Sequence, residues 1–273
     1  MKPRLAVWLL HAALVLGAIA ALLPMVWMVS ASLMPTGEAS TYPPRLFPST
    51  ITFAHYGELF TRLDLGRYLL NSTFISLAVT AVSLVINSMA GYAFAKLRFR
   101  GREKAFRLLV TGLVIPVQVS MLPLFLLMKQ LGLVNTYWGV IIPSLASIFG
   151  IFLIRQYAVS VPDELLDAAR IDGASELRIY TSIVVPVIRP ILATLAIWTF
   201  LTTWNDFMWP LIVLSDSRRY TLPVGLASLV GEHVQDTELM MAGSVLTIFP
   251  VLLVFLFLQR YYVEGVMQGS VKG

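Results

Sequence analysis

The chain of 273 residues is 58% hydrophobic and only 13% charged, with a formal net charge of +5. Soluble domains carry about 25% charged residues, so this composition excludes an ordinary soluble enzyme and a disordered protein and favours a multi-pass membrane protein. The positive charge alone fits either a nucleic-acid binder or a membrane protein with positive inner loops.

Six long stretches with few or no charged residues predict six membrane helices, which makes the expected fold an all-α membrane protein. A membrane helix needs roughly 20 mostly apolar residues to cross about 30 Å of hydrocarbon. In chain order the expected spans lie near residues 6–32, 69–94, 108–128, 137–154, 191–214 and 240–259. The first stretch is longer than the roughly 7–15 apolar residues of a signal peptide, so we expect a retained helix. Residues 1–273 are expected to form a single transmembrane domain.

The basic residues predict the orientation of these spans. With both termini in the cytoplasm, 14 of the 20 Lys and Arg residues fall in inner segments, and six of those 14 lie between positions 96 and 107. Inner loops of membrane proteins carry such an excess, so the reverse topology is rejected. Because the 96–107 cluster lies between two spans, we read it as an orientation signal and expect no nucleic-acid partner.

The longest inner segment, 155–190, has the pattern of a helix–turn–helix. Ser160 is expected to cap the first helix with Asp163 three residues later, and Gly173 after Asp172 is expected to end it. A second helix is expected from about Ala174, with one apolar face formed by Leu177, Tyr180 and Val184. Pro186 and Pro190 then end this helix and redirect the chain into the fifth span.

Two interpretations of this segment remain open from the residues alone. It is either a connector or lipid-surface helix, or an element that docks into a groove on a soluble partner. Two features favour docking, namely the small residues Ala168 and Ala169 at a packing position and a glycine that fixes the angle between two short helices.

The sequence Asp167-Ala-Ala-Arg-Ile-Asp-Gly173-Ala, followed by Ile183-Val-Val-Pro186, resembles the EAA motif of binding-protein-dependent ABC importer permeases of the MalG-like, carbohydrate-uptake family. The segments 116–123, 131–136, 204–210, 221–225 and 259–273 resemble the same family. Asp167 stands where the family usually has Glu, and Val185 where it usually has Leu, and both changes are conservative.

This resemblance implies a transport subunit of an ATP-driven importer, with no enzymatic activity of its own. The implied partners are a second, homologous permease subunit, two ATP-binding subunits that hold ATP and Mg, an extracytoplasmic sugar-binding protein, and the lipid bilayer of a bacterial or archaeal cytoplasmic (inner) membrane. Residues of the 155–190 segment would couple the permease to the ATPase: Glu164, Asp167, Ala168, Ala169, Asp172, Gly173, Ala174 and Pro186. The outer loop would face the binding protein with Thr221, Leu222, Pro223 and Gly225.

Asp206 is the single charged residue inside a predicted span, and it has two open interpretations. A structural one lets Asn205 and Asp206 bond a neighbouring helix while Trp204 and Trp209 anchor the outer interface. A functional one places these residues in a sugar path, because carboxylates, amides and aromatic rings bind sugars. The candidate path residues are Trp204, Asn205, Asp206, Trp209, Gln118 and Asn87.

Other function classes find less support in the residues. An ion-coupled secondary transporter would need several intramembrane acids or histidines, and Asp206 is the only acid. A membrane-embedded enzyme would need clustered His, Asp or Glu near an interface, whereas the acidic cluster lies in the 155–190 segment. The chain has no cysteine, its histidines are His11, His55 and His233, and it has no Gly-x-x-x-x-Gly-Lys-Ser/Thr loop, so we expect no metal, cofactor or catalytic residue.

Overall fold

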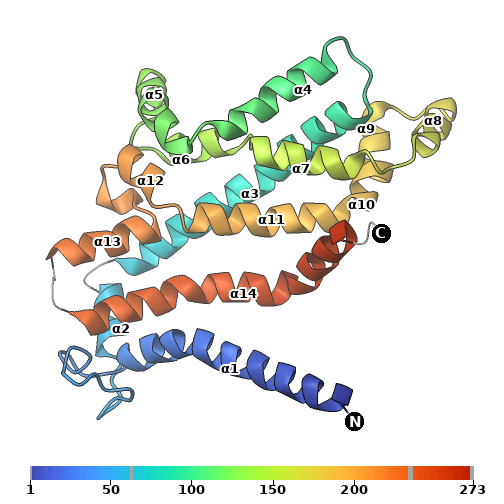
Figure 1. Ribbon diagram of the computed structural model, residues 1–273. Coiled ribbons are helices and arrows are strands. Elements are labelled where there is room, and N and C mark those ends of the chain that lie inside the picture. Colours follow the sequence, from blue (N-terminus) through green and yellow to red (C-terminus); the bar gives the residue numbers. More distant parts are fainter. Residues whose placement is uncertain (1, 62–63, 233–235, 271–273) are drawn as a thin grey trace. The chain divides into compact units, whose positions relative to one another are not determined.

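The computed structural model of the chain describes residues 2–61, 64–232 and 236–270 (Figure 1), and every regular element in these ranges is helical. The contacts within the chain divide it into two compact units. Unit 1 contains Met1–Gly66 and Gly225–Pro250, and unit 2 contains Arg67–Val224 and Val251–Gly273.

Length and composition give four helical segments that can cross a membrane unbroken, and two bent helix pairs that raise the number to six. The unbroken ones are Ala6–Ala31, Leu65–Lys96, Tyr137–Ala158 and Thr237–Phe257. They lie in α1 (Lys2–Ala31), α3 (Leu65–Lys96), α6 with α7 (Tyr137–Ser144 and Ile148–Ala158), and α14 (Thr237–Ser270). The all-helical class is therefore confirmed, and the four to six candidate spans are consistent with the six that were expected.

The predicted span over 108–128 is interrupted by a bend. Here α4 (Arg102–Thr111) and the short η1 (Gly112–Val114) are followed, after a bend of 106°, by α5 (Val117–Gln130). Ile115 is extended, with φ −80° and ψ 118°. The next residue is Pro116, whose ring disfavours the helical conformation of the residue before it.

The predicted span over 191–214 is also broken. Helix α11 (Arg189–Trp204) ends ten residues before the predicted limit, and α12 (Met208–Val213) is a separate short helix. The predicted fourth span, 137–154, ends too early. Helix α7 continues to Ala158, so Arg155, where the inner segment was expected to start, lies in the last turn of a helix.

Unit 1 is organised by buried polar groups as well as by apolar packing. Ala31, Met34 and Ala39 form a small core around the end of α1, and Trp27 and Met241 pack against it. The backbone N–H of Ala39 donates to Glu238 at 2.7 Å. The short helix α2 (Ala54–Thr61) is fixed by His55, whose Nε2 lies 2.9 Å from the Met34 carbonyl oxygen.

Unit 2 has two apolar cores along α3. One is built from residues of α3, α7, η2 and α11, with Tyr92, Ile154, Val184 and Leu195 among its buried members. The other gathers residues of α3, α5, α6 and α12 around Trp209. Close helix approach depends on glycine: a Cβ at Gly91 would lie 2.6 Å from Cγ2 of Ile154. These contacts hold the inner segment at one end of α3 and α7 (Figure 1).

The expected outer loop that includes Thr221 and Gly225 is largely helical, with the short η3 (Ser217–Arg219) followed by α13 (Leu222–Glu232). Asn135 fixes the start of this region, because its side-chain oxygen accepts hydrogen bonds from the backbone N–H groups of Ser215 and Asp216.

Candidate functional site

The segment after α7 forms a compact helix–turn–helix that begins differently from the prediction. Helix α8 (Asp163–Ile171) follows Pro162, and no side chain caps its first turn. The Ser160 hydroxyl instead donates to the Tyr157 carbonyl oxygen at 2.7 Å, so the predicted Ser160–Asp163 capping box is wrong. Asp163 and Glu164 lie in the first turn, where carboxylates complement the positive end of the helix dipole.

Gly173 ends α8, as predicted. Its φ of +79° is left-handed, a conformation that glycine adopts without a steric cost. The N–H of Gly173 donates to the Arg170 carbonyl oxygen at 3.0 Å, and the N–H of Ala174 donates to that of Ala169 at 2.9 Å. These two bonds form a Schellman motif, which satisfies the last carbonyl groups of the helix.

The second helix starts two residues later than expected and has a different apolar face. Ser175 caps α9 (Glu176–Ile179) by accepting from the N–H of Arg178, and the π-helical turn η2 (Tyr180–Val184) and α10 (Val185–Val187) follow. Leu177 is 63% exposed, whereas Ile179, Tyr180 and Val184 are buried, so the predicted face was wrong at Leu177. The π turn widens the helix, which places residues five apart on the same side. The predicted redirection is confirmed: an 81° bend falls at Ile188, between Pro186 and Pro190.

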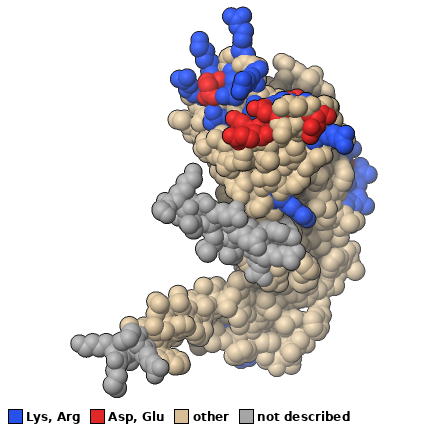
Figure 2. All heavy atoms as spheres, turned by 90° about the vertical axis from the view of Figure 1, so that its right-hand side faces the viewer, with Lys and Arg blue, Asp and Glu red and all other residues tan. Residues whose placement is uncertain are grey.

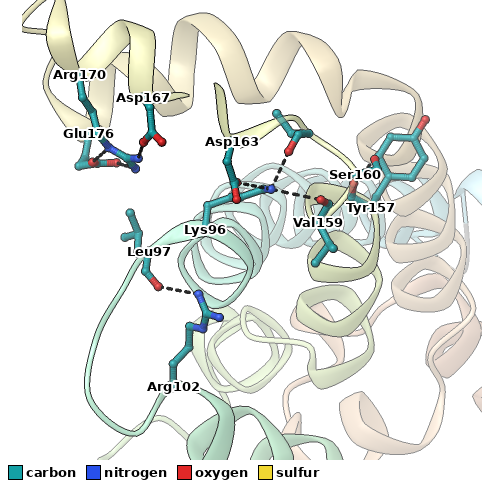
Figure 3. Close-up of polar contacts among 11 residues, drawn as sticks. Lys96, Leu97, Arg102, Tyr157, Val159, Ser160, Asp163, Asp167, Arg170 and Glu176 are labelled. Atoms are coloured by element: carbon teal, nitrogen blue, oxygen red, sulfur yellow. Dashed lines mark hydrogen bonds and ion pairs between the residues drawn. The ribbon is translucent and has the colours of Figure 1, made fainter. Parts of the chain in front are cut away.

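Lys96, the last residue of α3, ties the start of the helix–turn–helix to the helix bundle. Its ammonium group donates to the carbonyl oxygens of Val159 and Val161 at 3.1 and 2.6 Å, and to a carboxylate oxygen of Asp163 at 2.7 Å (Figure 3). The hydrogen bond from Lys96, together with its charge, lowers the pKa of Asp163 below its ordinary value. The Lys96 side chain is almost fully buried, with 7% of it exposed. Its charge is therefore neutralised by the ion pair with Asp163 and not by solvent.

Arg170 closes the helix–turn–helix from the other side. Its guanidinium lies 2.7 Å from Asp167 in the same helix and 2.8 Å from Glu176 across the turn (Figure 3). Glu176 also accepts a hydrogen bond from the hydroxyl of Tyr92 on α3, at 2.7 Å. The hydrogen bonds from Arg170 and Tyr92 lower the pKa of Glu176. The angle between α8 and α9 is thus fixed by charge-assisted bonds as well as by Gly173.

The outer face of the element combines exposed apolar side chains with acidic ones. Leu165 and Leu177 are exposed and Ile171 is 86% exposed, while the carboxylates of Glu164 and Asp172 also face outward. Ala168 is exposed, and Ala169 and Ala174 pack against the core. Sequence reasoning missed Lys96, Arg170 and Tyr92 as the fixing residues. Arg170 lies within the EAA-like motif, which is the signal that could have found it.

A second feature of unit 2 is a cavity of about 460 Å³ at the point where three helices are interrupted. The breaks at Gly112–Ile115, at Ser144–Ser147 and at Asp206 all contribute to its lining, together with Thr199 and Trp198. Irregular backbone at membrane depth is tolerated where it is buried in protein or lines a cavity. Asp206 also accepts a hydrogen bond from the N–H of Trp209 at 3.4 Å, so it supports the start of α12.

The structure separates the other candidate path residues from this cavity. Trp204 is buried and stacks on Phe200, and Trp209 is buried and donates to the Gly139 carbonyl oxygen, so neither anchors an outer interface. Asn87 is buried and accepts from the N–H of Ser147. Asn205 and Gln118 are exposed, and Asn205 bonds back to Leu201 in its own helix. Asp206 alone of the six lines the cavity.

The residues expected to face a binding protein start a helix and do not form an open loop. Thr221 and Leu222 are buried, and the N–H of Leu222 donates to the hydroxyl of Ser72 at 2.7 Å. Pro223 is half-buried and Gly225 is buried in α13.

Residues 83–267 match the family of binding-protein-dependent transport system inner membrane components. The chain belongs to this family. Relatives include the arabinooligosaccharide transport permease AraQ of Halalkalibacterium halodurans, which is 41% identical over 97% of this chain and 96% of its own length. The lactose transport permease LacG of Rhizobium radiobacter is 35% identical over 100% of this chain and 98% of its own length.

Solved structures agree with this assignment. A bacterial ABC transporter involved in the import of alginate contains a chain with a TM-score of 0.83 and 26% identity, covering 96% of this chain and 98% of its own. The protein is therefore a permease subunit of a binding-protein-dependent ABC importer, and it is not an enzyme.

Proposed function

We propose that this permease forms half of a translocation pathway for a sugar, and that its helix–turn–helix over 155–190 transmits ATP hydrolysis from partner subunits. The proposed assembly adds a second homologous permease, two ATP-binding subunits that hold ATP and Mg, and an extracytoplasmic sugar-binding protein. The names of the relatives support a sugar as the substrate. The alginate transporter solved in complex with a periplasmic protein shares the fold at a TM-score of 0.64, which is compatible with such an assembly.

The coupling role rests on one observation. The helix–turn–helix is held at a fixed angle and exposes apolar side chains. Ile171 and Leu177 are exposed, while Arg170, Glu176 and Gly173 hold the two helices at one angle. Amphipathic helices bind by placing such side chains in a groove on a partner. A fixed angle lets closure of the ATPase subunits move the attached helix bundle, so that the cavity alternates between the two sides.

Replacement of Gly173 by proline tests this role. Proline fixes φ near about −65°, far from the observed +79°, and it removes the N–H that bonds to Arg170. We expect loss of transport and of sugar-stimulated ATPase activity in the complete transporter, with the permease still present in the membrane.

Gly132 offers a matched control outside the coupling segment. It also ends a helix, with φ +69° and an N–H bonded to the Lys129 carbonyl oxygen. Gly132→Pro should keep the ratio of sugar-stimulated to basal ATPase activity. Normal coupling in Gly173→Pro would refute the proposed role of the element.

We further propose that the cavity beside Asp206 belongs to the sugar path. Discontinuous helices commonly line substrate sites in transporters. Here three helix breaks line the cavity together with the carboxylate of Asp206, several hydroxyl groups and the ring of Trp198. Asp206→Asn separates the two roles of this residue, because asparagine caps helices as well as aspartate does. We expect Asp206→Asn to keep the protein level but reduce sugar transport, whereas unchanged transport would leave only the capping role.

The segment 221–225 is proposed to support the surface that meets the binding protein. Because Thr221 and Leu222 are buried, their contribution would be to fix the start of α13. The identity of the sugar is best tested on the cognate binding protein, by measuring its affinity for a panel of saccharides. A binding protein without affinity for any saccharide would refute a sugar substrate.

A further inference from the structure

The turn between α3 and α4 faces α8 across a charged groove that the proposed transport cycle does not use. The groove has a volume of about 970 Å³ and lies between residues 95–107 and the side chains of Asp163, Asp167 and Arg170. Figure 2 shows basic side chains gathered beside acidic ones on the face turned to the viewer.

The charges of the groove do not balance. Seven basic and three acidic residues line it. Each acidic residue is already paired: Glu103 with Arg102 and Arg155, Asp163 with Lys96, and Asp167 with Arg170. The remaining cations are exposed and form no ion pair or hydrogen bond within the described part of the chain: Arg98, Arg100, Lys104 and Arg107.

Exposed apolar side chains accompany these cations. Phe99 lines the groove and is 46% exposed, and Leu108, which follows the lining residue Arg107 in the chain, is 75% exposed. The groove begins at Lys96, where α3 ends, and α3 is long and apolar enough to cross a membrane. Unpaired cations and exposed apolar side chains are therefore adjacent at the end of a membrane span. An amphiphile with an anionic head and an apolar tail matches both features.

We propose that this groove binds the phosphate headgroup of an anionic phospholipid, with its acyl chains lying over Phe99 and Leu108. Basic pockets beside membrane helices bind such headgroups. The phosphate would relieve the mutual repulsion of the four unpaired cations and so steady the α3–α4 turn, which forms the wall of the groove opposite α8. Since α8 carries the exposed face of the helix–turn–helix, a bound lipid would hold that element in place. The proposal rests on α3 crossing the membrane and does not require the coupling role.

The test uses the complete transporter, delipidated and then placed in nanodiscs of phosphatidylcholine alone or of equal parts phosphatidylcholine and phosphatidylglycerol. Native mass spectrometry counts the phosphatidylglycerol molecules retained. We expect Arg100→Gln/Lys104→Gln to weaken retention at least about tenfold, because each lost cation near the surface weakens binding several-fold. The charge-preserving variant Arg100→Lys/Lys104→Arg should retain the lipid.

Lys2→Gln/Arg4→Gln is the matched control, since it removes the same charge from another segment assigned to the same side. Equal retention by Arg100→Gln/Lys104→Gln and wild type, or equal loss in the control, would overturn the proposal. In the wild type, hydrogen exchange over 163–179 should be slower with phosphatidylglycerol than without it. The same slowing by soluble inorganic phosphate in phosphatidylcholine would overturn the lipid assignment.

The two proposals fail separately. Coupled sugar transport with no effect of phosphatidylglycerol on retention or exchange would overturn the lipid site alone. A retained lipid in a transporter whose ATPase activity does not respond to sugar would overturn the proposed function alone.

Discussion

At the scale of single residues, Arg170 decides how the helix–turn–helix keeps its angle. Its guanidinium joins Asp167 of α8 to Glu176 of α9, and Glu176 is in turn held by Tyr92 of α3. A planar guanidinium can hold two carboxylates at once, which a lysine cannot do with the same geometry. One side chain therefore links both helices of the element to the bundle.

Arg170→Gln should loosen this element without unfolding the permease. Partly exposed ion pairs contribute about 1 kcal/mol or less each, so we expect hydrogen exchange in 163–179 to quicken by about fivefold. Arg178→Gln is the control, because Arg178 is an exposed arginine of the same segment whose side chain has no ion pair within the described residues. Equal exchange in both variants would contradict a fixing role for Arg170.

The same pairing predicts a dependence on pH. Because the pKa of Glu176 is lowered below its ordinary value of 4.5, its pairing contributes stability that is fully present above pH 4.5. This contribution is lost as the pH falls through the lowered pKa. Acidification should therefore lower the protection of the amides over 163–179, measured against their intrinsic exchange rate at each pH, in the wild type and have less effect in Arg170→Gln.

At the scale of elements, the approach of α3 to α7 depends on the absence of a side chain at Gly91. A Cβ there would lie 2.6 Å from Cγ2 of Ile154 and 3.0 Å from the backbone nitrogen of Arg155. Ile154 can move only into a core that is already filled, because it is fully buried. The contact also sets the position of Lys96, the residue that holds the inner segment.

Gly91→Ala should therefore destabilise the permease by about 1–3 kcal/mol, the usual cost of overpacking a filled core. The measurement is the thermal stability of the detergent-solubilised protein, followed by size-exclusion chromatography. Gly57→Ala is the control, since Gly57 lies in α2 with open space around its Cβ position. The double variant Gly91→Ala/Ile154→Ala should be less destabilised than the sum of the two single changes. Additive effects would show that the two side chains do not compete for space.

At the scale of the whole molecule, the distribution of charge predicts the orientation of the spans in the membrane. The six basic residues between 96 and 107 and those of 155–190 belong to the segments assigned to the inside, and they supply most of the excess. The structure adds that Lys96 and Arg170 of these two segments line the same groove. One cluster of cations would thus orient the chain and also provide the proposed lipid site.

The absence of cysteine makes this orientation directly testable. Tyr42→Cys and Ile171→Cys place single thiols at side chains that are 97% and 86% exposed. In right-side-out vesicles, a membrane-impermeant maleimide should label Tyr42→Cys at once and Ile171→Cys only after detergent is added. The opposite labelling pattern would reverse the proposed topology.

The sequence by itself determined the class of the molecule and the end of one helix. Four of the six gaps between charges correspond to unbroken helical segments that can cross a membrane, and Gly173 marked the end of α8 correctly. The apolar character of a stretch is a property of the stretch itself, and a helix end depends on the few residues around it. Both can therefore be read from the sequence. The EAA-like motif likewise identified the family before any geometry was known.

Only the tertiary structure decided which side chains work together. Hydropathy does not register a break such as the one at Ile115 before Pro116, so two expected spans proved to be bent pairs or separate helices. The buried face of the second helix contains Ile179, Tyr180 and Val184 and not Leu177, because those three side chains pack in one core with residues of α3 and α7. The partnership of Lys96 with Asp163, 67 residues apart, depends on how α3 and α7 pack side by side. Long-range pairing of this kind has no local signature, because it is set by the packing of whole helices.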